Sequence, residues 1–181
     1  MIRLCSSSIT RAQLLTDAGI EFIQESKDFD ENSIIATSPK NFVYQATLGK
    51  YETNLKEFGF DDYPLLVADT VVTSQNQILR KARCVDDARN ILMTQSGNIT
   101  SIVTCMIYQT PRKKLIDISQ TDYIFSEFNL EDLEIYLDSG EWRGKAGACM
   151  VEGFCKSYIK EVRGYESTAM GLNTDTLKVW L

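Results

Sequence analysis

The chain has 181 residues, of which 44% are hydrophobic and 24% are charged, and its net charge is −6. This composition is that of one compact globular unit, and the negative charge disfavours a nucleic-acid partner, because duplex binding depends on many Lys and Arg side chains. No run of about eighteen apolar residues is present and the first residues lack a signal-peptide pattern, so we expect a cytoplasmic protein with no membrane partner.

The first predicted elements are a strand over residues 2–5 and a helix that begins after Ser8 and ends near Gly19. Ser8 is a typical N-cap, and Gly19 supplies the left-handed residue that often ends a helix. Arg11 lies in the first turn, where the helix dipole disfavours a cation and a bound anion would relieve the mismatch. A capped surface helix with a solvated Arg11 is the simpler interpretation of this segment alone.

The next predicted elements are a strand over residues 20–23 and an acidic segment over residues 28–31. Ser38 and Pro39 then predict the start of a helix, with the serine as its cap and the proline in its first turn. This helix extends at least to Lys50.

Asp69 interrupts the apolar pattern of a predicted buried strand, because residues 65–68 are Leu-Leu-Val-Ala and two valines follow Thr70. A strand covered on both faces is a continuous run of Val, Ile and Leu, and burying an unpaired carboxylate is costly. We therefore expect Asp69 to be paired, metal-bound or catalytic. The alternative is a strand that ends at Ala68, with Asp69 in a turn.

The remaining segments alternate between strands and helices. The predicted strands cover residues 71–73 and 77–79, which form a hairpin followed at once by Lys81, and residues 100–109, 115–128 and 158–162. The predicted helices cover residues 86–94, with Met93 toward the core, and residues 129–140. This alternation predicts a mixed α/β sheet.

A glycine-rich segment over residues 139–153 contains Lys145. Glycines permit close approach of the backbone to a ligand, as in phosphate-binding loops. Such loops are common, so a solvated Lys145 is the simpler interpretation of this segment alone.

The five cysteines form no Cys-x-x-Cys pair. An odd number in a chain expected to be intracellular argues against a disulfide framework and a zinc site. We interpret all five as small buried hydrophobic residues.

The chain contains no histidine. It therefore has no Ser-His or Cys-His nucleophile, no His metal site and no imidazole acid or base. Proton transfer falls to Asp, Glu, Lys, Tyr or water, and a metal would be a hard cation such as Mg²⁺ or Mn²⁺ held by oxygen ligands.

Taken in order along the chain, these motifs resemble the Maf family, the septum-formation-inhibitor-like nucleoside triphosphate pyrophosphatases. The resemblance covers nearly the whole chain. The matching motifs are Leu4-x-Ser6-x-Ser8-x-x-Arg11, Asp30-Glu31, Lys50, Ala68-Asp69-Thr70-Val71-Val72, Ile78-Leu79-x-Lys81, Asp87-Ala88-Arg89, Ser139-Gly140-Glu141, Lys145-Ala146-Gly147-Ala148 and Gly171-Leu172. The resemblance implies a single α/β domain over residues 1–181, similar in fold to the inosine-triphosphate pyrophosphatases: a long, twisted mixed sheet flanked by helices, with two lobes around a central cleft.

The same resemblance implies hydrolysis of a nucleoside triphosphate to a nucleoside monophosphate and pyrophosphate with Mg²⁺ or Mn²⁺, a nucleotide-pool role with a link to cell division. Asp69 would be the general base that activates water and would help to hold the metal, and Glu31 would be a second acidic ligand unless it caps a loop. The residues that would surround the triphosphate are Ser8, Arg11, Lys50, Lys81 and Lys145.

The resemblance links three positions to base selection, which here are Thr10, Thr70 and Glu152. Thr70 matches pyrimidine-preferring members, Glu152 matches members that prefer 7-methyl-GTP, Thr10 matches neither, and Lys145 favours the pyrimidine type. We therefore expect dTTP or UTP as substrate. The alternative is 7-methyl-GTP, because a carboxylate at Glu152 would accept hydrogen bonds from a guanine-like edge unless it simply faces water.

Two other functions are compatible with the motifs. One is a non-catalytic nucleotide-binding regulator of septum formation, and the other is an inosine-type pyrophosphatase, which the local motifs match less well. Homodimers are common among similar proteins, so a second copy of the chain is an expected partner.

Overall fold

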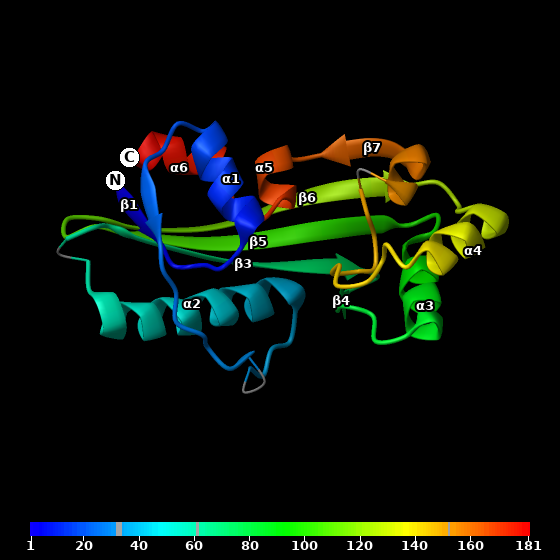
Figure 1. Cartoon of the computed structure of the whole chain (residues 1–181), viewed down its shortest axis with the longest axis horizontal. Coiled ribbons are helices and arrows are strands. Elements are labelled where there is room, and N and C mark those ends of the chain that lie inside the picture. Colours follow the sequence, from blue (N-terminus) through cyan, green and yellow to red (C-terminus); the bar gives the residue numbers. More distant parts are fainter. Residues whose placement is uncertain (32–33, 61, 152) are drawn as a thin grey trace. The chain divides into compact units, whose positions relative to one another are not determined.

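The structure is a computed structural model that describes residues 1–31, 34–60, 62–151 and 153–181. Within these residues, seven strands form one mixed sheet, accompanied by six α-helices and a 3₁₀ helix (Figure 1). The elements are β1 (Ile2–Leu4), α1 (Ile9–Asp17), β2 (Phe22–Gln24), α2 (Pro39–Phe58), β3 (Leu65–Ser74), β4 (Gln77–Leu79), α3 (Val85–Gln95), β5 (Ile99–Gln109), β6 (Lys114–Phe125), α4 (Leu130–Ser139), η2 (Phe154–Tyr158), β7 (Ile159–Arg163), α5 (Glu166–Ala169) and α6 (Thr174–Trp180).

The chain divides into two compact units, and the strands β3, β5 and β6 each contribute residues to both. The first unit comprises Met1–Thr70, Val103–Gln120 and Tyr165–Leu181, and the second comprises Val71–Ile102 and Thr121–Gly164. The order of strands along the sheet is β2-β1-β3-β5-β6-β7, and β4 pairs with β3. The predicted α/β class with a mixed sheet is confirmed, and the central cleft that the resemblance implies remains a prediction.

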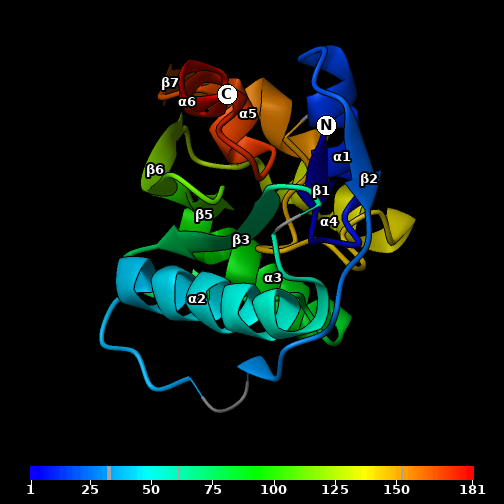
Figure 2. The ribbon, with the colours of Figure 1, turned by 90° about the vertical axis from the view of Figure 1, so that its left-hand side faces the viewer.

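Helices cover both faces of the sheet in the first unit. β1 runs parallel to β2 and to β3, with Leu4 opposite Leu66. Figures 1 and 2 show α2 on one face of these strands and α1, α5 and α6 on the other. Successive side chains of a strand point to opposite faces. Accordingly, Leu66 and Ala68 pack with Leu15 of α1, whereas Leu65 and Val67 pack with Tyr51 of α2.

The helix starts of the first unit follow the predicted capping pattern. The Ser8 side chain accepts a hydrogen bond from the backbone nitrogen of Arg11, and that of Ser38 accepts one from Asn41. Pro39 occupies the first turn of α2, where its missing N–H leaves no intrahelical bond unmade. After α1, Gly19 takes the left-handed conformation with φ of 71°. Both predicted helix starts are confirmed.

The second unit contains the predicted hairpin and an aromatic cluster. β3 and β4 pair antiparallel, and the turn between them places Gln75 and Asn76 at positive φ. Asn129 caps α4, which ends at Gly140 in the left-handed conformation. The ring of Phe154 stacks on Tyr136. No helix in the described part of the chain is both long and apolar enough to cross a membrane.

Two expectations about side chains in the second unit are wrong. Met93 is 43% exposed instead of facing the core, because the buried face of α3 is formed by Ala88, Leu92 and Gln95 and Met93 lies off that face. Cys149 and Cys155 form a disulfide, and Cys84 is exposed. Only Cys5 and Cys105 are the buried thiols that the sequence predicted, and burial raises their pKa to about 12 and about 11 respectively.

Candidate functional site

Asp69 lies inside a strand. β3 continues from Leu65 to Ser74 without a break, so the alternative in which the strand ends at Ala68 is wrong. The residue is 8% exposed. The strand alternation that directs Leu65 and Val67 toward α2 directs Asp69 to the same face.

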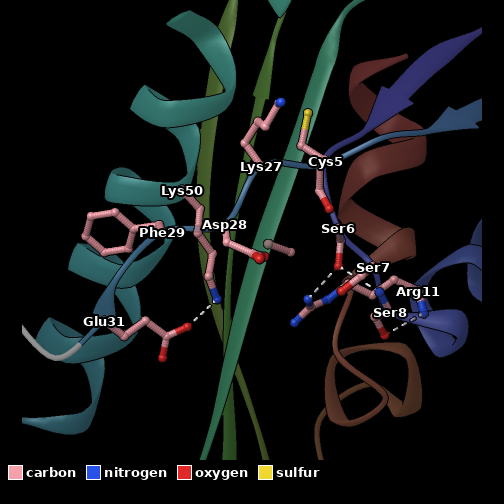
Figure 3. A pocket seen from close by; sticks show the side chains of 12 residues that line it. Cys5, Ser6, Ser7, Ser8, Arg11, Lys27, Asp28, Phe29, Glu31 and Lys50 are labelled. Atoms are coloured by element: carbon pink, nitrogen blue, oxygen red, sulfur yellow. Dashed lines mark hydrogen bonds and ion pairs between the residues drawn. The ribbon is translucent and has the colours of Figure 1, made fainter. Parts of the chain in front are cut away.

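Lys50 of α2 meets this carboxylate. Its Nζ lies 2.6 Å from Oδ1 of Asp69 and 2.6 Å from Oε1 of Glu31, so a single ammonium joins two carboxylates. Figure 3 shows the Lys50 side chain directed toward Glu31. The structure therefore brings together three residues that the sequence analysis selected.

Burial and charge act in opposite directions on this cluster. Burial raises the pKa of Asp69 above its usual value, and the adjacent Lys50 ammonium only partly offsets this effect. Burial alone would lower the pKa of Lys50, but the charges of Asp69 and Glu31 hold it above its usual value. Lys50 is therefore a fixed positive charge, and Asp69 is a carboxylate with increased proton affinity.

Arg11 lies on the opposite face of β3, where strand alternation places Thr70. Its Nη2 donates to Oγ1 of Thr70 at 3.0 Å, its Nη1 donates to Oγ of Ser6 at 3.0 Å, and its Nε donates to the carbonyl oxygen of Gly171 at 2.8 Å. Burial lowers the pKa of Arg11, and the charges of Asp69 and Glu31 counteract that shift. A guanidinium has five N–H donors and these hydrogen bonds occupy three of them, so Arg11 retains donors for an anion.

A cavity of about 280 Å³ in the first unit opens between Lys50 and Arg11. Figure 3 shows Lys50 and Glu31 on one side of it, and Ser6, Ser8 and Arg11 on the other. The cavity is at the lower end of the volumes that small-molecule sites occupy. It is lined by Cys5, Ser6, Ser7, Ser8, Arg11, Ser26, Lys27, Asp28, Phe29, Glu31, Lys50 and Ala68. Three cationic side chains and a serine-rich loop line this pocket together with the carboxylates of Asp28 and Glu31, and the cations and hydroxyls can bind a phosphorylated ligand.

Lys81 and Lys145 belong to the second unit, where their segments lie side by side. Lys81 forms an antiparallel bridge with Ala146, and the backbone nitrogen of Gly147 donates to the carbonyl oxygen of Arg80 at 3.2 Å. Gly147 has φ of 68°, and a Cβ there would lie 3.0 Å from Val72, so this glycine permits close packing within the protein. The joint action of Lys81 and Lys145 with the residues of the first unit remains a prediction.

The three expected specificity positions have different surroundings. Thr10 is exposed in the first turn of α1. Thr70 is hydrogen bonded to Arg11 and to Thr104, both at 3.0 Å. Glu152 lies outside the described residues.

Among the cavity residues that the sequence did not single out as site residues, Ser6 and Phe29 contact its selected members or their neighbours. Ser6 receives a hydrogen bond from Arg11, and only its place in the motif with Ser8 could have identified it. Phe29 lines the cavity and its ring lies directly over Gly49 of α2, the residue before Lys50. Nothing in the local sequence pattern predicts that contact.

Glu31 and Asp69 are the two carboxylates that contact the Lys50 ammonium. Within the described residues, no cluster of three or more His, Cys, Asp or Glu side chains could enclose a metal ion. Mg²⁺ is commonly bound through one or two carboxylates together with water and substrate phosphate. A carboxylate pair that now shares one ammonium fits that mode of binding.

Comparisons with known proteins place the chain in a family. The model of the family described as Maf-like protein matches residues 1–181. A nucleoside triphosphate pyrophosphatase of a Nitratiruptor species is 55% identical over 98% of this chain and 96% of its own. Proteins of the same name from Campylobacter jejuni and Helicobacter pylori are both 38% identical, the first over 100% of each chain and the second over 96% of this chain and 91% of its own. The chain belongs to the family of Maf-like proteins.

Proposed function

We propose that this protein hydrolyses a nucleoside triphosphate between its α and β phosphates, releasing a nucleoside monophosphate and pyrophosphate. The observation that carries the proposal is the buried Asp69 carboxylate, paired with Lys50, which lines a cavity together with Arg11. The family and the names of the relatives support the same reaction.

Asp69 is the proposed general base. It accepts a proton from water as the water oxygen bonds to the α-phosphorus, and the bond between that phosphorus and the bridging oxygen breaks, leaving pyrophosphate with the electron pair. A base works best when its pKa approaches the working pH. The upward shift of the Asp69 pKa by burial is in that direction.

The proposed role of Ser8, Arg11 and Lys50 is to bind the triphosphate and to stabilise the charge that develops on it. Phosphoryl transfer depends mostly on positioning and charge neutralisation. Arg11 offers its remaining N–H groups, and Lys50 offers an ammonium that its two carboxylates keep protonated. We propose that Lys81 and Lys145 contribute further positive charge to the same substrate.

Mg²⁺ or Mn²⁺ is the proposed cofactor, with Asp69 and Glu31 as its protein ligands. When bound, such a cation neutralises phosphate charge and orients the reacting groups. Lys50 would remain near both carboxylates and limit their mutual repulsion.

The proposed substrate is dTTP or UTP, with 7-methyl-GTP as the alternative, and Thr10, Thr70 and Glu152 are the proposed base-selecting residues. We also propose that residues 1–181 act as one domain, and that the activity serves nucleotide-pool housekeeping with a link to cell division.

A nucleotide panel tests the reaction. Purified protein with Mg²⁺ or Mn²⁺ in ¹⁸O-labelled water is expected to release pyrophosphate from at least one nucleotide and to place the label in the monophosphate. Release of orthophosphate and a nucleoside diphosphate would contradict the proposal. Nucleotide binding without any release would favour a non-catalytic regulator.

A further inference from the structure

A chain of hydrogen bonds connects Arg11 to the interior of the first unit. Its Nη2 lies 3.0 Å from Oγ1 of Thr70, which lies 3.0 Å from Oγ1 of Thr104 on β5. Thr104 in turn lies 2.8 Å from the carbonyl oxygen of Thr168. Thr104 and Thr168 are both fully buried.

The donors in this chain follow from the chemistry of its ends. A carbonyl oxygen only accepts, so Thr104 donates its single hydroxyl proton to Thr168. The bond between the two threonine hydroxyls then requires Thr70 as its donor. The lone pairs of Thr70 are left to accept from Arg11, whose guanidinium only donates.

The same carbonyl connects to Arg11 by a second route. The Thr168 oxygen also accepts from the backbone nitrogen of Gly171 at 3.0 Å. The carbonyl oxygen of Gly171 accepts from Nε of Arg11 at 2.8 Å. Gly171 has φ of 104°, and a Cβ there would lie 3.3 Å from Oγ1 of Thr70. The Nε and Nη2 groups of Arg11 are thus both held by groups that converge on Thr168.

We propose that Thr104 is a positioning residue that fixes the orientation of the Arg11 guanidinium toward the triphosphate, acting through Thr70 and Thr168. The inference rests on the proposed role of Arg11 in binding the substrate. Without the Thr104 hydroxyl, Thr70 loses its acceptor, and no hydrogen bond from Thr70 then fixes its lone pairs toward Arg11. Arg11 then keeps its bonds to Ser6 and Gly171 but loses the firm placement of Nη2, although no residue in contact with the ligand has changed.

Binding of inorganic tripolyphosphate, measured by calorimetry, tests this role without requiring turnover. Thr104→Val is expected to weaken binding by about tenfold, which corresponds to the usual cost of leaving a buried hydroxyl without its partner. Thr104→Ser keeps the hydroxyl and is expected to bind as the wild-type protein does. Failure of hydrolysis by the wild-type protein would refute the proposed function and leave this binding test intact.

A double-mutant cycle with Arg11→Met separates positioning from general structural damage. If Thr104 acts through Arg11, Thr104→Val changes tripolyphosphate affinity by less than about twofold in the Arg11→Met background. An equal loss in both backgrounds, or a Thr104→Ser variant as weak as Thr104→Val, would overturn the inference. An Arg11→Met variant with wild-type affinity would overturn it as well.

Thr70→Val provides a second variant if Thr104→Val does not fold, because Thr70 is half-buried. It breaks the same chain at its next member, so its effect is also expected to vanish in the Arg11→Met background. Full additivity of Thr70→Val with Arg11→Met would contradict the proposed route.

Discussion

Lys50 on α2 and Asp69 on β3 form an ion pair in the first unit, with 2.6 Å between Nζ and Oδ1. The pair joins two layers of the fold, because Asp69 is on the face of β3 that α2 covers. Glu31 shares the same ammonium at 2.6 Å. The pKa of Asp69 therefore depends on burial, on the charges of Lys50 and Arg11, which lower it, and on the charge of Glu31, which raises it.

Removing the cation should shift the acid limb of the pH profile upward. Lys50→Met eliminates the larger of the two charges that lower the Asp69 pKa, so the carboxylate is protonated at higher pH and kcat/KM should fall at a higher pH than in the wild-type enzyme. Lys50→Arg keeps the charge and is the matched control. An acid limb that stays in place in Lys50→Met would show that Asp69 is not the titrating base.

Removing the anion should shift the same limb in the opposite direction. The charge of Glu31 raises the Asp69 pKa, so Glu31→Gln should move the acid limb of kcat/KM to lower pH. Glu31→Asp retains the charge and serves as its control. A shift in the same direction for Glu31→Gln and Lys50→Met would contradict the electrostatic account of this cluster.

Gly49 provides a test of the contact between α2 and Phe29, which belongs to the acidic segment over residues 28–31. A Cβ at Gly49 would lie 2.3 to 2.6 Å from the Phe29 ring, so Gly49→Ala should displace the ring and lower the free energy of unfolding. In a Phe29→Ala background the clash is absent, and the same substitution should stabilise the protein by about 0.5 to 1 kcal/mol, as alanine normally does in a helix. Urea denaturation measures both effects. If Gly49→Ala changed the free energy of unfolding in the same direction in both backgrounds, the contact between Phe29 and Gly49 would be refuted.

Ser8 allows the capping and anion-binding roles to be separated. Ser8→Ala should cost about 1 kcal/mol in free energy of unfolding, because the side chain caps α1. Ser8→Asp keeps a capping oxygen and should preserve stability, but its negative charge should weaken tripolyphosphate binding at least about tenfold. Unchanged binding by Ser8→Asp would favour the simpler interpretation, a capped surface helix.

Local sequence signals predicted the elements that position the cluster. Ser8 and Ser38 identified two helix starts, and the interruption of an apolar strand identified Asp69. Each signal depends only on residues adjacent in the chain, since a cap and a strand are decided over a few positions. The pairing of Asp69 with Lys50 came only from the structure.

Contacts between distant residues could not be predicted in this way. Thr70 and Thr104 are 34 residues apart, and Arg11 and Gly171 are 160 apart. The Phe29 ring reaches Gly49 by a side-chain direction that no periodicity encodes. The short helices α5 and α6 also lacked a recognisable pattern, because their four and seven residues span too few turns.

The substitution Asp69→Asn tests the central claim most directly. It keeps the shape of the side chain and removes the base, and Glu31 remains to pair Lys50. The measurement is pyrophosphate release at saturating nucleotide, and tripolyphosphate affinity checks that binding is intact. The matched control is Asp62→Asn, because Asp62 is exposed and precedes β3. The account predicts a fall in kcat of at least about a hundredfold for Asp69→Asn with binding retained, and no change for Asp62→Asn. An Asp69→Asn variant that releases pyrophosphate at the wild-type rate would contradict it.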